Sequence, residues 1–393
     1  MQVRGGNRPL DCCIVPPMAP RTLIAVVHAS TGSGQRLAAE AVSSEIASLG
    51  SDAVTVEALD LAELVPGWCL RATDGFLSRS PLGRRTLSAL SGLLAAAGRP
   101  LAERLAALSP AAVVCTHPLA ALIAGRGAHT TRYRVMTAEA DFGLPGLTPR
   151  TGISLHCVAD ENAEAELVRR GVPASAVSVT GVPIRPQFSI EYDTAAARAH
   201  FGLPAEQRIL LALVGSGDPD PDSAFTESLT TALPALAGIP ATAVVVVAGR
   251  DEGLASRLRS RSAGFTNTNV HVFEYVEYMA PLMATADLAL ARPSGLVCAE
   301  CAASGLPLVA LGPTSGRERA NARALLDAGA GIYDHDPRTI TEQARGVLAD
   351  GARLARMREA ASGIARPFAA ASVARHAVGL AGVALDAEPQ VRA

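Results

Sequence analysis

Small and polar residues between positions 288 and 321 are spaced as in a phosphate-binding site. An apolar run that closes at Pro293 predicts a buried strand, and helix formers follow over residues 296–304. Ser294 and Gly295 form the turn between them, where small side chains let a ligand approach the first amides of the helix. Those amides have no partner within the helix and carry partial positive charge, which favours an anion. We therefore predict that a phosphate binds at this turn.

Glu300 lies further along the same predicted helix, where a carboxylate cannot serve the phosphate. It could accept hydrogen bonds from a ribose, as an acidic residue does in dinucleotide sites. A solvated helix glutamate explains the residue equally well. A second apolar run at residues 308–311 completes a strand–turn–helix–strand unit. Residues 313–321 then place polar groups after a strand's carboxyl end, where ligands collect in open α/β sheets, and a helix is expected to follow over 322–328.

A similar unit opens the chain. Residues 22–28 predict a buried strand, and a loop containing Gly32 and Gly34 then begins a helix that ends near Gly50. This loop is weak evidence for a phosphate site, because a Gly-x-Gly pair is common and the P-loop lysine is missing. With a second alternating strand at residues 53–59, the pattern predicts a parallel, doubly wound α/β sheet.

The 293–321 segment resembles the donor site of the GT-B glycosyltransferases that make monogalactosyl- and monoglucosyl-diacylglycerol. It is more distantly similar to that of the N-acetylglucosaminyltransferase that forms lipid II. Those enzymes carry Pro-Gly-Gly-Leu-Thr-x-x-Glu and then Pro-Gly-Gln-Glu-x-x-Asn, and seven residues match here: Pro293, Gly295, Leu296, Glu300, Gly316, Glu318 and Asn321. Four depart from the pattern: Ser294, Val297, Ser315 and Arg317.

The resemblance implies a role for each matched position. Glu300 would bind the uridine ribose, the Ser294-Gly295 turn the diphosphate, and Glu318 with Asn321 the sugar. Arg317 replaces the family's glutamine, which leaves the identity of the hexose open.

Other loops of the second half extend the resemblance. Gly215, Ser216 and Gly217 follow the predicted strand at 209–214, where the family's backbone approaches the diphosphate. Arg250 follows the next strand, and Tyr275 and Val276 stand where the family's backbone holds the uracil. The implied donor is a UDP-sugar, which is a substrate, so no cofactor is expected. No acidic pair stands at metal-ligand spacing, and we expect no metal ion.

The first half departs from the family at a catalytic position. Family members carry a histidine in the loop after the first strand, but this chain has Gln35 there, and glutamine cannot take a proton at neutral pH. Alternative general bases are His28, His117 and Asp141. His117 lies in a Thr-His-Pro sequence that the family also has, and a structural histidine at a strand end explains it equally well. An acceptor with a phosphate or carboxylate nucleophile would need no base.

Chain length and composition predict two domains of an ordinary globular protein. We expect a disordered tail over 1–20 or translation from Met18, an acceptor domain over 21–189, and a UDP-sugar domain over 190–380 whose final helix returns to the first. Residues 381–393 would form a second tail. The net charge of the whole chain is −2, which gives no electrostatic footprint for nucleic acid.

Residues 82–108 mix arginine with leucine and alanine, in one or two helices broken at Gly98 and Pro100. Such a segment suits peripheral contact with an anionic membrane, but an amphipathic helix that covers the sheet has the same pattern. No apolar stretch is long enough to span a bilayer. Seven scattered cysteines, with Cys298 and Cys301 expected as a buried reduced pair, favour a cytoplasmic protein that could lie on the inner face of the plasma membrane.

Three functions fit the sequence. The first is an inverting hexosyltransferase that uses a UDP-sugar and a lipid or lipid-linked acceptor such as diacylglycerol. The second is the same chemistry on a soluble natural product. The third is a nucleotide-sugar-binding protein with impaired catalysis, which Gln35 motivates.

Overall fold

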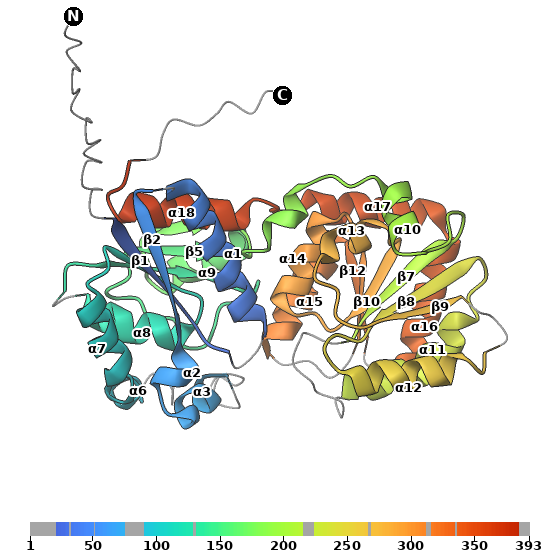
Figure 1. The fold of residues 1–393 in the computed structure, drawn as a ribbon, viewed down its shortest axis with the longest axis horizontal. Helices are drawn as coiled ribbons and strands as arrows, with labels where there is room; N and C mark the ends of the chain where they lie inside the picture. Colours follow the sequence, from blue (N-terminus) through green and yellow to red (C-terminus); the bar gives the residue numbers. More distant parts are fainter. Residues whose placement is uncertain are drawn as a thin grey trace, which may run out of the picture.

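The computed structural model describes residues 21–30, 33–50, 52–74, 90–128, 131–214, 224–265, 269–311, 316–334 and 336–384. Over these residues the chain forms two parallel six-stranded sheets with helices on both faces, and the two layered units lie side by side (Figure 1). The predicted GT-B class, with two doubly wound sheets, is thereby confirmed. Gly32 and residues 215–217 lie outside the described residues, as do both predicted tails except for residues 381–384.

The first sheet has the order β2-β1-β3-β4-β5-β6. Its central strands are short runs of Val, Ile, Ala and Cys buried on both faces, as expected for a parallel sheet covered by helices. The strands are β1 Thr22–His28, β2 Val54–Asp60, β3 Ala112–Cys115, β4 Arg134–Ala138, β5 Leu155–Val158 and β6 Val177–Val179. The helices are α1 Ser33–Gly50, α2 Leu61–Leu64, α3 Gly67–Asp74, α6 Ser91–Ala97, α7 Arg99–Leu108, α8 Pro118–Gly127, α9 Glu161–Arg169 and the 3-10 turns Ala174–Ala176 and Pro186–Ser189.

The predicted break in the 82–108 segment occurs at Gly98 alone. A Cβ atom there would lie 2.1 Å from the Ile123 side chain of α8, so only glycine allows this close approach. Pro100 does not break the chain. It lies in the first turn of α7, where proline is tolerated because no intrahelical N–H bond is lost. Residues 82–89 lie outside the described residues.

The second sheet has the order β12-β11-β10-β7-β8-β9. Its strands are β7 Arg208–Leu213, β8 Thr242–Val247, β9 Val270–Phe273, β10 Leu288–Ala291, β11 Leu308–Leu311 and β12 Gly331–Asp334. The helices are α10 Thr194–His200, α11 Ala224–Ala237, α12 Glu252–Ser262, α13 Met279–Ala284, α14 Gly295–Ala303, α15 Gly316–Ala328, α16 Pro337–Ala349, α17 Gly351–Gly363 and α18 Ala369–Leu380.

Helix α15 corrects the sequence analysis, which placed residues 317–321 in a loop before a helix at 322–328. The helix begins at Gly316. Glu318 in its first turn interacts favourably with the helix dipole, which helps to explain the earlier start. The polar side chains of this segment therefore project from a rigid element.

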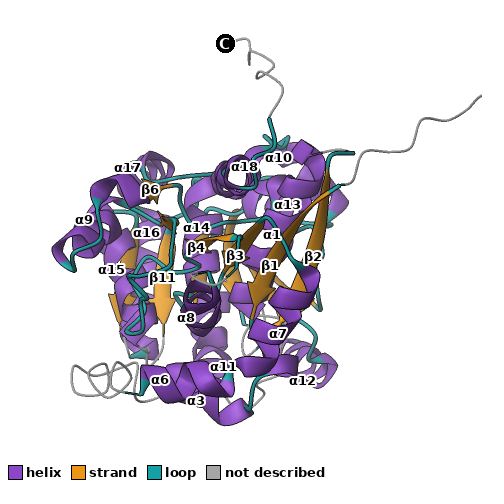
Figure 2. Cartoon of the chain, turned by 90° about the vertical axis from the view of Figure 1, so that its left-hand side faces the viewer, coloured by secondary structure: helices purple, strands orange, loops and turns teal. Residues whose placement is uncertain are grey.

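The last helix, α18, packs on the first domain. It contacts α1, β3 and β4. Figure 1 shows it in red over the first domain, and Figure 2 shows it above the strands of the first sheet. Val373, Ala374, Ala377 and Val378 are each 0% exposed and pack among residues of β1, β3 and α1. The core of the first domain therefore includes residues from both ends of the described chain.

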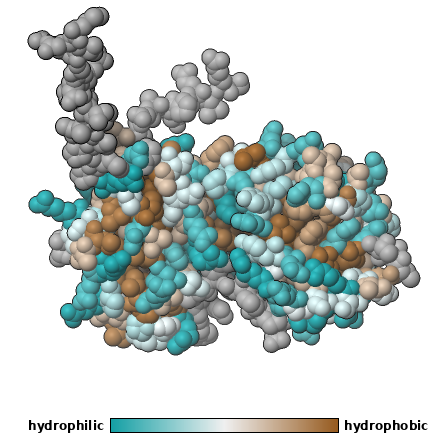
Figure 3. Space-filling view, in the orientation of Figure 1, coloured by the Kyte–Doolittle hydropathy of each residue, from teal (hydrophilic) through white to brown (hydrophobic). Residues whose placement is uncertain are grey.

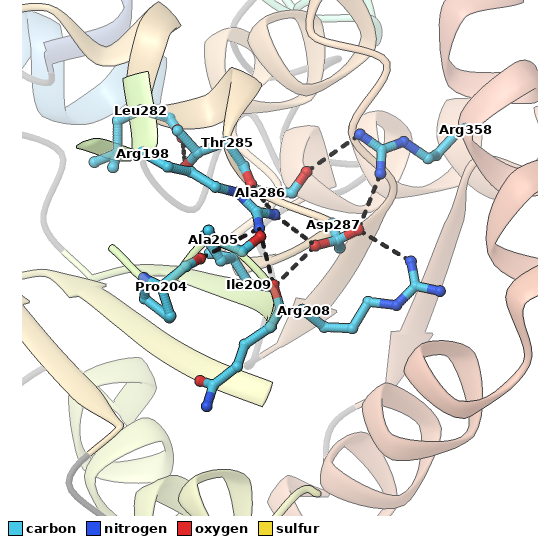
Figure 4. Close-up of polar contacts among 11 residues, drawn as sticks. Arg198, Pro204, Ala205, Arg208, Ile209, Leu282, Thr285, Ala286, Asp287 and Arg358 are labelled. Carbon is cyan, nitrogen blue, oxygen red and sulfur yellow. Dashed lines mark hydrogen bonds and ion pairs between the residues drawn. The ribbon is translucent and has the colours of Figure 1, made fainter. Parts of the chain in front are cut away.

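Asp287, just before β10, connects several elements of the second domain (Figure 4). Its carboxylate accepts a hydrogen bond from the Ile209 amide at 2.9 Å and from the guanidinium groups of Arg198, Arg208 and Arg358 at 3.1 to 3.4 Å. These arginines lie in α10, in β7 and in α17. Because Asp287 is only 7% exposed, it supplies a buried negative charge on which these elements converge.

We expect Asp287→Ala to lower the free energy of unfolding by about 3–5 kcal/mol, since removing one member of a buried ion pair leaves the other charges uncompensated. Urea unfolding measures the change. Asp287→Asn keeps an acceptor for the Ile209 amide and should cost less. The control is Asp327→Ala, which removes an exposed pair with Arg323 and should cost less than about 1 kcal/mol. A cost at residue 287 no larger than that of the control would contradict a structural role for the cluster.

Candidate active site

The two domains meet where carboxyl ends of first-sheet strands face the starts of α14 and α15. Gly34, at the start of α1, lies near α14, because a Cβ atom added there would be 3.8 Å from a methyl carbon of Leu296. The Thr116 hydroxyl, after β3, donates to the Gln35 carbonyl at 3.1 Å and ties the start of α1 to the neighbouring strand end. Candidate residues from both halves of the sequence therefore border one interdomain seam.

The start of α14 combines a capped turn with a close backbone approach. The Ser294 hydroxyl accepts a hydrogen bond from the Val297 amide at 3.3 Å, as an N-cap residue does. A Cβ atom on Gly295 would lie 2.0 Å from the Ala140 carbonyl oxygen and 2.8 Å from the Asp141 Oδ1 atom. Only glycine allows the loop after β4 to come this near to the helix.

Asp141 from the first domain is bound by groups of the second. Its carboxylate accepts hydrogen bonds from the Gly295 amide and, at 2.8 Å, from Asn321 Nδ2, and it lies 3.7 Å from Arg317. Asn321 also accepts from the Phe142 amide at 2.8 Å. Burial raises the pKa of Asp141, and Arg317 and the hydrogen bonds of Asn321 and Gly295 act in the opposite direction. Asp141 and Asn321, which were predicted to serve different substrates, are thus direct partners.

Asn321 is fully buried, and its amide makes a third bond, to the Pro293 carbonyl at 3.1 Å. The bonds of Asn321 to Asp141 and Phe142 hold the two domains together. Its role in sugar binding stays a prediction.

Glu300 lies on α14 and is 7% exposed, so it is not a solvated surface residue. Arg185, from the segment that connects the two sheets, donates to its carboxylate at 3.4 Å. Burial raises the pKa of Glu300 to about 7, against the effect of Arg185. Arg185 is the charged partner found for Glu300 among the described residues, so this buried carboxyl retains acceptor capacity for hydroxyl groups.

The other residues that the sequence placed at the donor site lie in two groups, one around Glu318 and one around Tyr275. Arg292 after β10 donates to the Glu318 carboxylate at 2.7 Å through Nη2. The Arg250 guanidinium lies 3.9 Å from the Tyr275 ring centroid, a cation–π arrangement, and Val276 next to it is half-buried. These two groups place charge and an aromatic surface after β8, β9 and β10 of the second sheet.

The two histidine candidates have different surroundings. His117 is 1% exposed, and its Nδ1 atom accepts from the Leu119 amide at 3.1 Å as the N-cap of α8. His28 ends β1 in register with Asp60 at the end of β2, and its Nδ1 atom lies 4.0 Å from the Asp60 carboxylate. Burial lowers the pKa of His28, and the Asp60 charge opposes that effect. The Nδ1 atom has no hydrogen-bond partner among the described residues, so Asp60 acts on the ring through its charge alone. A neutral imidazole at a strand end can serve as a general base.

Sequence reasoning did not select Asp60, Arg185 or Glu139 as site residues. Glu139 follows β4 directly, and burial, reinforced by Asp141, raises its pKa to about 7. Asp60 has a usable signal, since it ends the strand that neighbours the one ending at His28. Arg185 lies 115 residues from Glu300, and their pairing has no sequence signal.

A pocket opens at the same seam. It is lined by residues 143–146 of the first domain and by Arg170 on that side, and by Arg317 and Ala320 of α15 on the other. Among the described residues, no group of three or more His, Cys, Asp or Glu side chains is arranged to hold a metal ion. The seam therefore offers two arginines, Arg170 and Arg317, in a cavity between the two domains.

Comparison with known proteins identifies the second domain. Residues 220–374 match the Glycosyltransferase family 28 C-terminal domain. Residues 220–374 are thus similar to the C-terminal domain of family 28 glycosyltransferases. Glu300, Arg292, Arg317 and Asn321 all belong to this domain, and the resemblance found in the sequence is confirmed.

The family 28 assignment agrees with a curated relative. The chain is 30% identical over 228 residues to a processive diacylglycerol beta-glucosyltransferase of Bacillus licheniformis, a match that covers 58% of this chain and 57% of the relative. The chain thus aligns with less than two-thirds of that protein's length.

Solved structures support the fold. MurG of Acinetobacter baumannii aligns with a TM-score of 0.61 at 18% identity, over 92% of this chain and 100% of that one. The glycosyltransferase SnogD from Streptomyces nogalater aligns with a TM-score of 0.63, with the same identity and coverage. At this identity the likeness concerns the arrangement of the two sheets.

Proposed function

We propose that the protein transfers a hexose from a UDP-sugar to a lipid acceptor of the diacylglycerol type, with inversion at the anomeric carbon. The observation that carries this proposal is Glu300, buried on the helix that follows the Ser294-Gly295 turn and paired only loosely with Arg185. The relative named above acts on diacylglycerol, which favours a lipid over a soluble acceptor.

The proposed reaction needs three contributions from the chain. The acceptor oxygen forms a bond to the anomeric carbon while the bond from that carbon to the diphosphate breaks, and UDP leaves with the electron pair. The start of α14 and the arginines at positions 292 and 317 stabilise the charge on the leaving diphosphate. His28, which lies near the Asp60 carboxylate, takes the proton from the acceptor hydroxyl. No metal ion enters this scheme.

Calorimetric titration with UDP, with ADP as the comparison, tests the donor assignment. UDP-glucose, UDP-galactose and UDP-N-acetylglucosamine are then incubated with diacylglycerol in mixed micelles, and release of UDP is measured with and without lipid. Lipid-dependent release supports the proposal. Binding of UDP without lipid-dependent release would favour a soluble acceptor or a protein that only binds the nucleotide sugar. A failure to bind UDP would refute the donor assignment.

The lipid proposal implies a membrane-facing surface on the first domain. In the part of the chain that the structure describes, no helix is both long and apolar enough to cross a bilayer. Trp68 on α3 and Leu93 on α6 are 41% and 56% exposed, and both helices lie at the same end of the domain in Figures 1 and 2. Figure 3 shows hydrophobic residues on this domain down to that end. This end suits peripheral contact with the inner face of the plasma membrane.

We expect the double substitution Trp68→Ser and Leu93→Ser to lower binding to phosphatidylglycerol vesicles by about tenfold or more, because each side chain loses favourable transfer into the interface. Vesicle co-sedimentation measures the effect. Phe368→Ser is the matched control, since Phe368 is 60% exposed on another element. Equal binding of the double variant and the control would show that α3 and α6 do not face the membrane.

A further inference from the structure

The Asp141 carboxylate occupies the position at the start of α14 that the proposed function gives to the donor diphosphate. It accepts from the Gly295 amide and from Asn321 Nδ2, and Arg317 lies 3.7 Å away. These donors belong to the second domain, whereas Asp141 comes from the loop after β4 in the first. One domain thus places an anion on the anion-binding groups of the other.

The fit between the loop and the helix start is close on both sides of Asp141. Gly295 leaves no room for a Cβ atom against the Ala140 carbonyl, and a Cβ atom on Gly143 would lie 2.4 Å from the Cβ atom of Ala320. The Phe142 amide donates to the Asn321 side chain, so the loop backbone is also fixed. These contacts make the seating of Asp141 specific to this loop geometry.

Two anions cannot use these groups together. The Gly295 N–H has a single hydrogen to donate, and a phosphate beside the Asp141 carboxylate would place like charges within a few ångströms in a partly buried site. Either anion alone is stabilised by the same amide, the same side-chain donor and the same arginine.

We infer that Asp141 is an internal competitor of the donor diphosphate, an inference that rests on the proposed donor site. Binding of the UDP-sugar displaces its carboxylate from α14, breaks the Phe142–Asn321 bond and frees the loop after β4. The released loop borders the pocket at the seam, because Gly143 lines that pocket with Arg317. Donor binding therefore precedes the rearrangement of the acceptor side, and Asp141 limits donor affinity.

The test compares UDP binding by the wild type and by Asp141→Asn, which keeps the shape of the side chain and removes its charge. UDP should bind the variant about tenfold more tightly, whereas uridine, which lacks phosphate, should bind both equally. Asp193→Asn is the matched control. Asp193 caps α10 through the Ala195 and Ala196 amides, and its substitution should leave UDP binding unchanged.

Asp141→Ser provides a second uncharged variant in case asparagine disturbs the fold, and thermal unfolding verifies both. Hydrogen exchange of the wild type adds an independent readout, since UDP should speed exchange of the Phe142 amide. UDP binding that is equal or weaker in both variants would overturn the competition and leave the donor site intact. If neither the wild type nor either variant binds UDP, both the donor site and the competition are refuted.

Discussion

Replacing Glu300 with alanine will weaken the binding of UDP by about 10- to 150-fold. Hydrogen bonds to a charged group contribute about 1.5–3 kcal/mol, and each 1.4 kcal/mol is a factor of ten in affinity. Glu300 is buried and has Arg185 as its charged partner, so its remaining acceptor positions are available to ribose hydroxyls. Calorimetric titration of the variant beside the wild type measures the loss. Glu359→Ala, at an exposed position of α17, is the control for removing a helix glutamate.

The pH dependence of UDP binding makes this prediction more specific. The pKa of Glu300 is raised to about 7, so its carboxylate forms as the pH rises from 6 to 8, and a charged acceptor makes the stronger hydrogen bond. Wild-type affinity should therefore rise over this range by more than that of Glu300→Gln. Titration of the UDP phosphate is common to both proteins and cancels in the comparison. Parallel pH profiles would exclude Glu300 as a ribose ligand.

The raised pKa of Glu300 also determines how the stability of the protein changes with pH. Between the usual glutamate pKa of 4.5 and a pH of about 7, the folded protein holds a proton on Glu300 that the unfolded chain has released. The contribution of Glu300 to stability therefore decreases as the pH rises through this window. Glu300→Gln removes that part of the pH dependence.

Replacing His28 with glutamine will lower the rate of sugar transfer by about 10²–10⁴-fold, the usual contribution of a general base. UDP binding should not change, because His28 lies at the end of β1 in the first sheet. The rate is measured as release of UDP in the presence of diacylglycerol, with whichever of the three UDP-sugars proves to be a donor. His376→Gln is the matched control, since His376 lies on α18 and its Nε2 atom contacts the Ser178 hydroxyl.

The acid limb of the rate profile tests the partnership with Asp60. Burial holds the pKa of His28 below its usual 6.5, and the negative charge of Asp60 raises it. Asp60→Asn removes that charge, so the limb should move to lower pH. An unchanged transfer rate in His28→Gln would assign the proton to another group, or show that the acceptor brings an acidic nucleophile.

The alternation of apolar runs and helix patterns was sufficient to predict the fold. Buried strands such as residues 288–291 are continuous apolar segments, and glycine or proline marks their ends, so both sheets could be inferred. The sequence misplaced the start of α15, because the matched motif residues Gly316, Glu318 and Asn321 were assumed to lie in a loop.

The site was predicted only where its residues are close in sequence. Ser294, Gly295 and Glu300 lie on one turn and helix, so their proximity follows from helix geometry. The bond between Asp141 and Asn321 spans 180 residues and depends on how two domains face each other. No local sequence pattern predicts a contact between residues so far apart in the chain, and the same holds for the contact of Arg185 with Glu300.

The return of α18 to the first domain bears on how the protein is made. A ribosome releases the strands of the first sheet long before it has synthesised Val373 and Ala377, which complete the hydrophobic core around β1 and β3. Until then, the apolar face that these residues cover is exposed to solvent and to other nascent chains. The first half therefore stays incompletely folded until the last helix is made. During that interval chaperones must shield its exposed apolar face.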